Sequence, residues 1–241
     1  KKKFKLMSYL TPLTIAIFAN SAVYENKPSG FFSYRAKVWQ NTARAGLPKL
    51  FLENMDFEKY ADFIIKFPLL FIEKNNSYHY GENRTFKDFM EGKLKSHNFL
   101  PSSKDLGIHL STIFTEVRLK KYLEARSIDE CEWDCHCAGP AFYTGLVYGN
   151  LDESLDIIKK WDQNEVLNAY YDSPKNGLKT TIHNKSILDW GKIFLDISGN
   201  GLKKRNFLNS NDQDETIFLK NINNILKDQK TRAEKVLEKL K

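Results

Sequence analysis

The chain opens with a long run of apolar residues, LMSYLTPLTIAIFA at positions 6–19. One interpretation is an amphipathic or buried helix over 4–19 that ends at Asn20. The other is a secretory signal, because the basic stretch KKKFK precedes the run and small residues follow it. The pattern leaves both interpretations open, although the run is too short to span a bilayer.

Side-chain periodicity predicts a mixture of strands and helices over the next hundred residues. Asp56 is a suitable helix cap, Asn75 and Asn76 form a turn, and Thr85 precedes a short helix with Phe86, Phe89 and Met90 facing inward. The predicted elements are a strand at 31–39, a helix at 56–66, paired strands at 67–73 and 77–80, the helix after Thr85, a loop at 93–105 and a short helix or turn at 106–114.

The segment EVRLKKYLEARSI at 116–128 alternates between apolar and polar side chains at most of its positions. It predicts a strand whose apolar face carries Val117, Leu119, Leu123 and Ala125. The opposite face is almost wholly ionic. The pattern alone fits a solvent-facing antiparallel strand, and it also fits a strand that lines a polar funnel.

The chain after Pro140 has helical periodicity. Turn-forming residues separate some of the helices, notably Pro174, Gly177 and the Gly199–Asn200–Gly201 sequence. The predicted helices lie at 140–148, 152–160, 162–169, 185–198 and 214–240.

The formal net charge is +7, which suits an enzyme with anionic substrates as well as a weak binder of nucleic acid or anionic lipid. The lysines are scattered without a clustered basic arm, so we expect no nucleic-acid or membrane partner. Three cysteines, Cys131, Cys135 and Cys137, lie together with His136. Their spacing is poor for zinc, and their odd number argues against secretion. We expect reduced thiols in a cytoplasmic protein.

The sequence contains no GxGxxG, P-loop or GxSxG motif. Four stretches of the chain are distinctive: PLTIAIFANSAVYENKPSGFFSYRAKVWQNT at 12–42, TFKDFMEGK at 85–93, HLSTIFTEVRLKKYLEARSID at 109–129 and CAGPAFYTGLVY at 137–148. They resemble segments of glutamate–cysteine ligases of the plant and proteobacterial type, in the order and spacing of that family. The stretch at 12–42 resembles a family segment in which a helix ends at FANSP and a glycine-rich turn leads to SxRxxxW.

The resemblance implies an α+β fold similar to glutamine synthetase, with an antiparallel sheet bent into a funnel and helices outside it. It also implies that the L-glutamate side-chain carboxylate attacks the γ-phosphate of ATP. The amine of L-cysteine then attacks the γ-glutamyl phosphate, which is the first step of glutathione biosynthesis. Two anions must approach each other in this reaction, so arginines and Mg²⁺, a hard ion that prefers carboxylate ligands, would neutralise the phosphoryl group.

The resemblance assigns roles to three residues of this chain. Glu124, in YLEAR, corresponds to a magnesium ligand. Arg126, on the same strand face, corresponds to a catalytic arginine that contacts the ATP phosphates. Arg35, in SYR, corresponds to an arginine that holds a glutamate carboxylate, which a guanidinium can do with two parallel hydrogen bonds. Whether Glu116 or Arg118 acts directly is left open.

The chain also departs from the family pattern. Leu70, in Pro68–Leu69–Leu70–Phe71, replaces a tyrosine that helps to enclose the cysteine substrate. The plant hairpin disulfide has no counterpart, since 77–95 contains no cysteine. A ligase with another amine acceptor, and a non-catalytic ligand-binding relative, are therefore kept as alternatives.

The resemblance covers only the C-terminal half of the ligase. We expect residues 1–139 to form the C-terminal half of the catalytic domain and residues 140–241 to form a helical part that packs on it. Only one metal-type glutamate, Glu124, is visible, and the first residue is Lys1. We therefore expect that an N-terminal half of the same enzyme is missing and that residues 1–241 alone are inactive.

Overall fold

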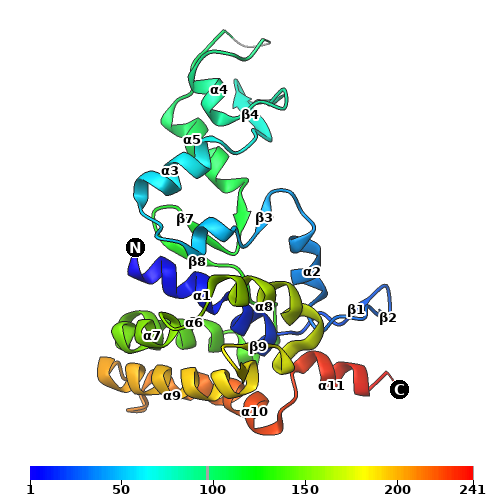
Figure 1. Ribbon diagram of the computed structural model, residues 1–241, viewed down its shortest axis with the longest axis vertical. Helices are drawn as coiled ribbons and strands as arrows, with labels where there is room; N and C mark the ends of the chain where they lie inside the picture. Colours follow the sequence, from blue (N-terminus) through cyan, green and yellow to red (C-terminus); the bar gives the residue numbers. More distant parts are fainter. Residues whose placement is uncertain (96–97, 241) are drawn as a thin grey trace.

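The computed structural model describes residues 1–95 and 98–240, and combines helices with short two-stranded sheets (Figure 1). Part of the predicted loop at 93–105, residues 96–97, lies outside the described residues. The helices are α1 (Lys2–Ile17), α2 (Tyr34–Gln40), α3 (Phe57–Ile65), α4 (Phe86–Met90), α5 (Ser103–Ser111), α6 (Ala138–Thr144), α7 (Leu151–Ile158), α8 (Gln163–Asn176), α9 (Ile187–Arg205), α10 (Lys220–Asp228) and α11 (Arg232–Glu238).

Each sheet in the described part of the chain has two strands. Four pairs are antiparallel and one, β3–β6, is parallel. This mixture confirms the α+β class. The pairs are β1 (Val23–Tyr24) with β2 (Lys27–Pro28), β3 (Ala45–Gly46) with β6 (Phe114–Thr115), β4 (Phe71–Lys74) with β5 (Ser77–Tyr80), β7 (Val117–Leu119) with β8 (Leu123–Ala125), and β9 (Thr181–Ile182) with β10 (Lys185–Ser186).

Helix α1 lies at the centre of the molecule and is buried on nearly all sides from Phe4 onward. It packs against α7, α8 and α9. Its hydroxyl groups form hydrogen bonds within the helix: Ser8 donates to the Phe4 carbonyl and Thr11 donates to the Met7 carbonyl. A helix without a solvent-facing polar stripe needs such internal bonds to be buried. The predicted helix at 4–19 is confirmed, and it packs as a core element.

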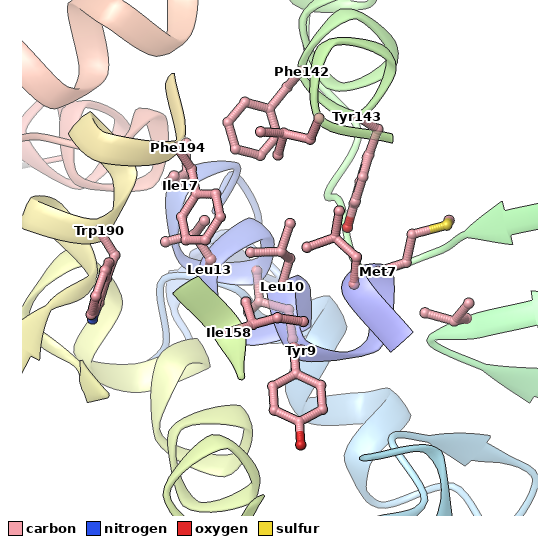
Figure 2. Packing of buried hydrophobic residues seen from close by; sticks show 14 of the residues in the cluster. Met7, Tyr9, Leu10, Leu13, Ile17, Phe142, Tyr143, Ile158, Trp190 and Phe194 are labelled. Carbon is pink, nitrogen blue, oxygen red and sulfur yellow. The ribbon is translucent and has the colours of Figure 1, made fainter. Parts of the chain in front are cut away.

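The core joins side chains that are far apart in the sequence (Figure 2). Leu10 and Leu13 of α1 lie between Phe142 of α6, Ile158 of α7 and Phe194 of α9, and all five are fully buried. Burying a side chain of this size stabilises the fold by about 1.5–3 kcal/mol. The C-terminal helices therefore hold α1 in place. None of the helices in the described residues has the length and apolar character needed to cross a bilayer.

Several local predictions are confirmed. Asp56 caps α3 by accepting from the Lys59 amide at 2.9 Å. Asn75 and Asn76 turn the β4–β5 hairpin with φ of 52° and 58°, as a two-residue hairpin loop requires. Thr85 caps α4, and Phe86 and Phe89 are buried as predicted. Met90 is half exposed, so its predicted inward position is wrong.

The predicted strand at 31–39 is wrong, because residues 34–39 belong to α2 and Ser33 is its cap. The Ser33 hydroxyl caps the helix by accepting from the Ala36 amide at 3.2 Å. The amides of Phe32 and Ser33 donate to the Pro174 carbonyl of α8, at 2.7 and 3.0 Å. A neighbouring strand would need those donors. The alternating pattern was therefore overridden by a helix cap and by contacts with a distant helix.

The single strand predicted at 116–128 is a hairpin, with its turn at Lys120–Tyr122. β7 and β8 pair with Arg118 opposite Glu124 and with Val117 opposite Ala125. The faces are as predicted, because register partners share a face and the apolar side packs on the core. Period-two alternation continues through a tight turn, so the pattern could not reveal the reversal.

The predicted turn at 199–201 lies inside α9, which runs unbroken to Arg205. The glycines serve close packing instead. A Cβ on Gly201 would lie 2.1 Å from the Gly145 carbonyl oxygen, and a Cβ on Gly145 would lie 2.2 Å from the Ser198 carbonyl oxygen. The π-helix η3 (Gly145–Gly149) thus contacts α9 backbone to backbone.

The remaining C-terminal helices also differ in their bounds. α8 continues past residue 169 to Asn176, with Pro174 inside it. The helix predicted at 214–240 is three pieces, η5 (Glu215–Leu219), α10 and α11. Gln229 ends α10 with a φ of 53°, and Thr231 starts α11 with a capping box. A left-handed residue followed by a cap stops one helix and starts the next.

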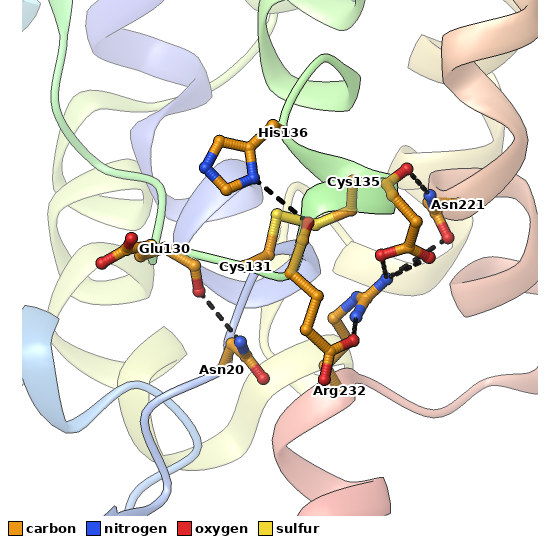
Figure 3. Close-up of a disulfide and its surroundings, with 9 residues drawn as sticks. Asn20, Glu130, Cys131, Cys135, His136, Asn221 and Arg232 are labelled. Atoms are coloured by element: carbon orange, nitrogen blue, oxygen red, sulfur yellow. Dashed lines mark hydrogen bonds and ion pairs between the residues drawn. A yellow bond between two sulfur atoms is a disulfide. The ribbon is translucent and has the colours of Figure 1, made fainter.

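The cysteines are not all reduced. Cys131 and Cys135 form a disulfide with a Cα–Cα distance of 6.0 Å (Figure 3). Cys137 is free and exposed. The turn η2 (Trp133–Cys135) brings the two backbones within the range that a disulfide spans. The expectation of reduced thiols is therefore wrong. Arg232 of α11 pairs with Glu132 and Asp134 inside this loop.

Candidate functional site

The ionic face of the β7–β8 hairpin carries a chain of ion pairs centred on Glu124. Arg118 donates to Glu124 Oε2 through Nε at 2.8 Å and lies within 2.7 Å of it through Nη2. Arg126 donates to Glu124 Oε1 through Nη1 at 2.8 Å. Glu124 thus bridges two guanidinium groups, and the pattern had correctly placed it beside Arg126.

Arg118 fixes one side of this bridge. It is buried, and its Nη1 also donates to the carbonyls of Ser111 and Ile113 at 2.9 and 3.2 Å. Burial alone would raise the pKa of Glu124, but hydrogen bonds from Arg118 and Arg126 outweigh it and hold that pKa below its ordinary value. Glu124 is therefore an anion at neutral pH, oriented by a buried arginine.

Arg35 reaches the same place from the first turn of α2. Its Nη2 donates to the Arg126 carbonyl at 2.7 Å, across 91 positions of sequence. Its Nη1 lies 4.0 Å from Asp129 Oδ1 and makes no hydrogen bond within the described residues. The structure therefore brings Arg35, Glu124 and Arg126 together.

Two aromatic rings form one wall of this cluster. Trp39 and Phe114 lie 5.3 Å apart between ring centroids. The Arg126 guanidinium carbon lies 5.3 Å from the Phe114 centroid and 5.9 Å from that of Trp39. Cation–π contacts of this kind limit the directions that the Arg126 side chain can take.

Glu116, whose role the sequence left open, lies beneath the cluster and is 3% exposed. Burial raises its pKa to about 7, although Arg35, the Tyr170 hydroxyl and Arg126 all act in the opposite direction. Tyr170 of α8 donates to Glu116 Oε1 at 3.1 Å. The Glu116 carbonyl accepts from the Arg126 amide at 2.8 Å. Glu116 thus connects α8 to Arg126, the residue that directly follows β8.

Sequence reasoning missed Asp129. This carboxylate is buried, and it accepts hydrogen bonds from the Asn20 amide, the Ser21 hydroxyl and the Ser33 hydroxyl. Its partners lie in two other motifs, FANS and SYR. The sequence offered one signal for this site: short polar side chains (Ser21, Ser33 and Asp129) occur in two of the stretches that resemble the family.

Residues 1–239 match the profile of glutamate–cysteine ligase family 2. The chain belongs to this family. It is 36% identical to glutamate–cysteine ligase B, chloroplastic, of Oryza sativa subsp. japonica, over 98% of this chain and 48% of that protein. It is 37% identical to the chloroplastic glutamate–cysteine ligase of Solanum lycopersicum, over 98% and 45%, and 36% identical to that of Arabidopsis thaliana, over the same shares.

The chain spans about half the length of these glutamate–cysteine ligases. Their names place them in the chloroplast, and this finding overturns the expectation of a cytoplasmic protein. That expectation rested on cysteine content. An odd number of thiols argues against an oxidising compartment, but it cannot distinguish one intracellular compartment from another.

The described residues of this chain do not by themselves make a magnesium site. Both oxygens of Glu124 are engaged by arginines. Among residues 1–95 and 98–240, no group of three or more histidine, cysteine, aspartate or glutamate side chains could hold a metal ion. Magnesium prefers several oxygen ligands in octahedral geometry. A site that includes Glu124 would need oxygen ligands beyond those that the described residues bring together.

Leu70, which replaces the family's tyrosine, lies just before β4 and is 46% exposed. Leu69 beside it is buried in a small apolar cluster with Ile72, Phe86, Phe89 and Leu94. The Leu70 side chain is therefore available at the surface and is not needed for this cluster.

Proposed function

We propose that this chain is the C-terminal part of an ATP-dependent ligase that joins the side-chain carboxylate of L-glutamate to the amine of L-cysteine, the first step of glutathione biosynthesis. The observation that carries the proposal is the family match over residues 1–239. The cluster of Arg35, Glu124 and Arg126 supports it, because it offers fixed cationic donors for anionic substrates.

The proposed reaction has two steps. A carboxylate oxygen of glutamate attacks the γ-phosphorus of ATP, and ADP leaves. The amine of cysteine, after losing a proton, then attacks the carbonyl carbon of γ-glutamyl phosphate and expels phosphate. Negative charge is spread over the phosphoryl oxygens in the first transition state and grows on the departing phosphate in the second, and oriented arginines stabilise both.

Each arginine has a proposed role that agrees with its surroundings. Arg35 would bind a carboxylate of glutamate through the guanidinium donors that its bond to the Arg126 carbonyl leaves over, because its side chain is 31% exposed. Arg126 would contact the ATP phosphates from the aromatic wall. Glu124 would contribute one oxygen to a magnesium site completed elsewhere, and it would have to exchange an arginine partner to do so.

We also propose that this half completes its sheet with strands from outside residues 1–241. The antiparallel funnel implied by the family is a larger structure than the two-stranded sheets described here. Strands this short have unpaired edges that another segment can extend. The division at residues 139 and 140 into a sheet-bearing part and a helical part is retained as part of this proposal.

The test uses the full-length polypeptide and its Glu124→Gln variant, assayed for phosphate release with ATP, magnesium, glutamate and cysteine. We expect the variant to lose activity by orders of magnitude, since one anionic oxygen donor is removed. The control is Glu215→Gln, because Glu215 also pairs with an arginine, and its side chain is 28% exposed against 26% for Glu124. Equal activity in both variants would refute the role of Glu124.

A second candidate is a ligase that uses a different amine as acceptor. It is favoured by Leu70, because an apolar side chain cannot donate the hydrogen bond that a tyrosine hydroxyl would. A panel of amino-acid acceptors at fixed ATP and glutamate separates the two candidates. A preference for another amine that Leu70→Tyr reverses toward cysteine would support the second candidate. Binding of ATP without phosphate release from any acceptor would point to the non-catalytic alternative.

A further inference from the structure

Asp129 lies at the point where three separate motifs of the chain meet. Its Oδ2 accepts from the Asn20 amide at 2.9 Å and from the Ser21 hydroxyl at 2.7 Å. Its Oδ1 accepts from the Ser33 hydroxyl at 2.8 Å and lies 4.0 Å from Nη1 of Arg35. These partners come from the end of α1 and from the start of α2, more than ninety positions away.

The same partners also bind the backbone at the first turn of α2. The Ser21 hydroxyl accepts from the Arg35 amide at 3.0 Å, and the Ser33 hydroxyl accepts from the Ala36 amide at 3.2 Å. Asp129 therefore contacts Arg35 in two ways. It binds the two hydroxyls that hold the backbone at the start of α2, and its carboxylate faces the Arg35 guanidinium.

The Asp129 side chain is only 2% exposed, whereas that of Arg35 is 31% exposed. A buried carboxylate with fixed hydrogen bonds keeps its place when solvent and ligands exchange around it. The other support of the guanidinium is the Arg126 carbonyl, which binds Nη2. With Nη2 held there and Nη1 drawn toward Asp129, the remaining donor directions of Arg35 are defined.

We propose that Asp129 is the positioning residue for Arg35. It does not touch substrate, and it fixes the direction in which the remaining N–H donors of Arg35 meet a substrate carboxylate. This inference rests on the proposed function in that the carboxylate is taken to be that of glutamate. The orientation of Arg35 by Asp129 is a separate claim, and it can be tested without turnover.

The informative variant is Asp129→Asn. The Asn20 amide can only donate, so the side-chain oxygen of the new residue must occupy the position of Oδ2 and its NH₂ group that of Oδ1. The bonds to Asn20 and Ser21 are then kept, and the Ser33 hydroxyl can accept instead of donate. Arg35 alone loses an attractive partner, because it now faces an NH₂ group.

In the full-length enzyme we expect Asp129→Asn to raise the KM for glutamate about tenfold or more, the range for losing a partner of a charged group, with little change in the KM for ATP. We expect Asp129→Asn to add nothing to the defect of Arg35→Lys when the two are combined, since both act through one guanidinium. Asp162→Asn is the control, because Asp162 caps α8 by accepting from two backbone amides and pairs with no arginine within the described residues. We expect it to leave both KM values unchanged.

Equal changes in both KM values, or multiplicative defects in the double variant, would overturn the proposal. If Asp129→Asn does not fold, Ser21→Ala replaces it. This variant removes the hydroxyl between Asp129 and the Arg35 amide, and we expect a roughly two- to tenfold rise in the KM for glutamate alone. An unchanged KM for glutamate in Ser21→Ala would count against the proposal.

A crystal structure of the folded variant separates the two claims. We expect the Arg35 guanidinium of Asp129→Asn to leave the Arg126 carbonyl. If the wild-type enzyme does not ligate glutamate but Arg35 moves in the variant, the proposed function fails and the positioning role stands. If the wild-type enzyme ligates glutamate and Arg35 stays in place, the positioning role fails.

Discussion

Replacing Glu116 with glutamine should remove a defined part of the pH dependence of stability. The pKa of Glu116 is about 7 in the folded protein against an ordinary value of 4.5, because the carboxyl group is buried. The folded state therefore binds this proton more tightly than the unfolded state does. Stability contributed by the protonated group is fully present below pH 4.5 and is lost as the pH rises through about 7.

The size of the effect follows from the two pKa values. At about 1.4 kcal/mol for each pH unit, the difference between 4.5 and about 7 corresponds to a loss of about 3 kcal/mol. Glutamine resembles the protonated acid, since its oxygen can still accept from Tyr170 and its NH₂ group replaces the carboxyl O–H. Glu116→Gln should thus match the wild type at pH 4.5 and be about 3 kcal/mol more stable at about pH 8.

The assay is urea unfolding of the full-length wild type and variant across this pH range. Fluorescence of Trp161 and Trp190, which are buried 4.9 Å apart in the core, reports on this half of the protein. The difference between variant and wild type isolates Glu116 from other titrating groups. A difference that is constant with pH, or a variant that is less stable at high pH, would refute the reasoning.

Three other predictions concern the site, the disulfide and the core. Arg35→Lys should raise the KM for glutamate about tenfold and change the KM for ATP little, because lysine keeps the charge but loses the fork; steady-state kinetics that give equal shifts would contradict this. Reduction of Cys131–Cys135 should cost at most about 2 kcal/mol of stability, since the loop is short, and should leave ligase activity intact; a large reversible loss of activity on adding dithiothreitol would show otherwise. Gly145→Ala should lower the free energy of unfolding by about 1–3 kcal/mol through overpacking against α9, whereas Gly107→Ala, whose new Cβ meets nothing within 4 Å, should be neutral or slightly stabilising; denaturant midpoints compare the two.

The sequence predicted those parts of the fold whose causes are local. The Asp56 cap and the Asn75–Asn76 turn involve neighbours in the chain, so a short pattern contains all of the information. The strand prediction for 31–39 failed because the amides of Phe32 and Ser33 donate to the Pro174 carbonyl, a partner that no local pattern can reveal. The prediction of a turn at 199–201 failed for a related reason. Glycine permits both a turn and close helix packing, and only the position of η3 decides between them.

The candidate site was predictable to a similar extent. Alternation placed Glu124 and Arg126 on one face, and their contact agrees with it. The resemblance named Arg35, but neither source of information indicated that it bonds to the Arg126 carbonyl. Asp129 and Glu116 act through buried contacts with distant elements. Their side chains look like ordinary polar positions until the helices that cover them are in place.

The burial of α1 has a consequence for the order of events during synthesis. Its partners in the core extend as far as Leu226, so most of them are made long after α1 itself. At about 5–20 residues per second, the ribosome needs roughly ten to forty seconds to reach them. During that interval a sixteen-residue segment that is apolar on nearly all sides lacks most of its core partners, and it resembles the segments that targeting factors and chaperones bind. Successful production of this polypeptide should therefore depend more on chaperone supply than its finished surface suggests.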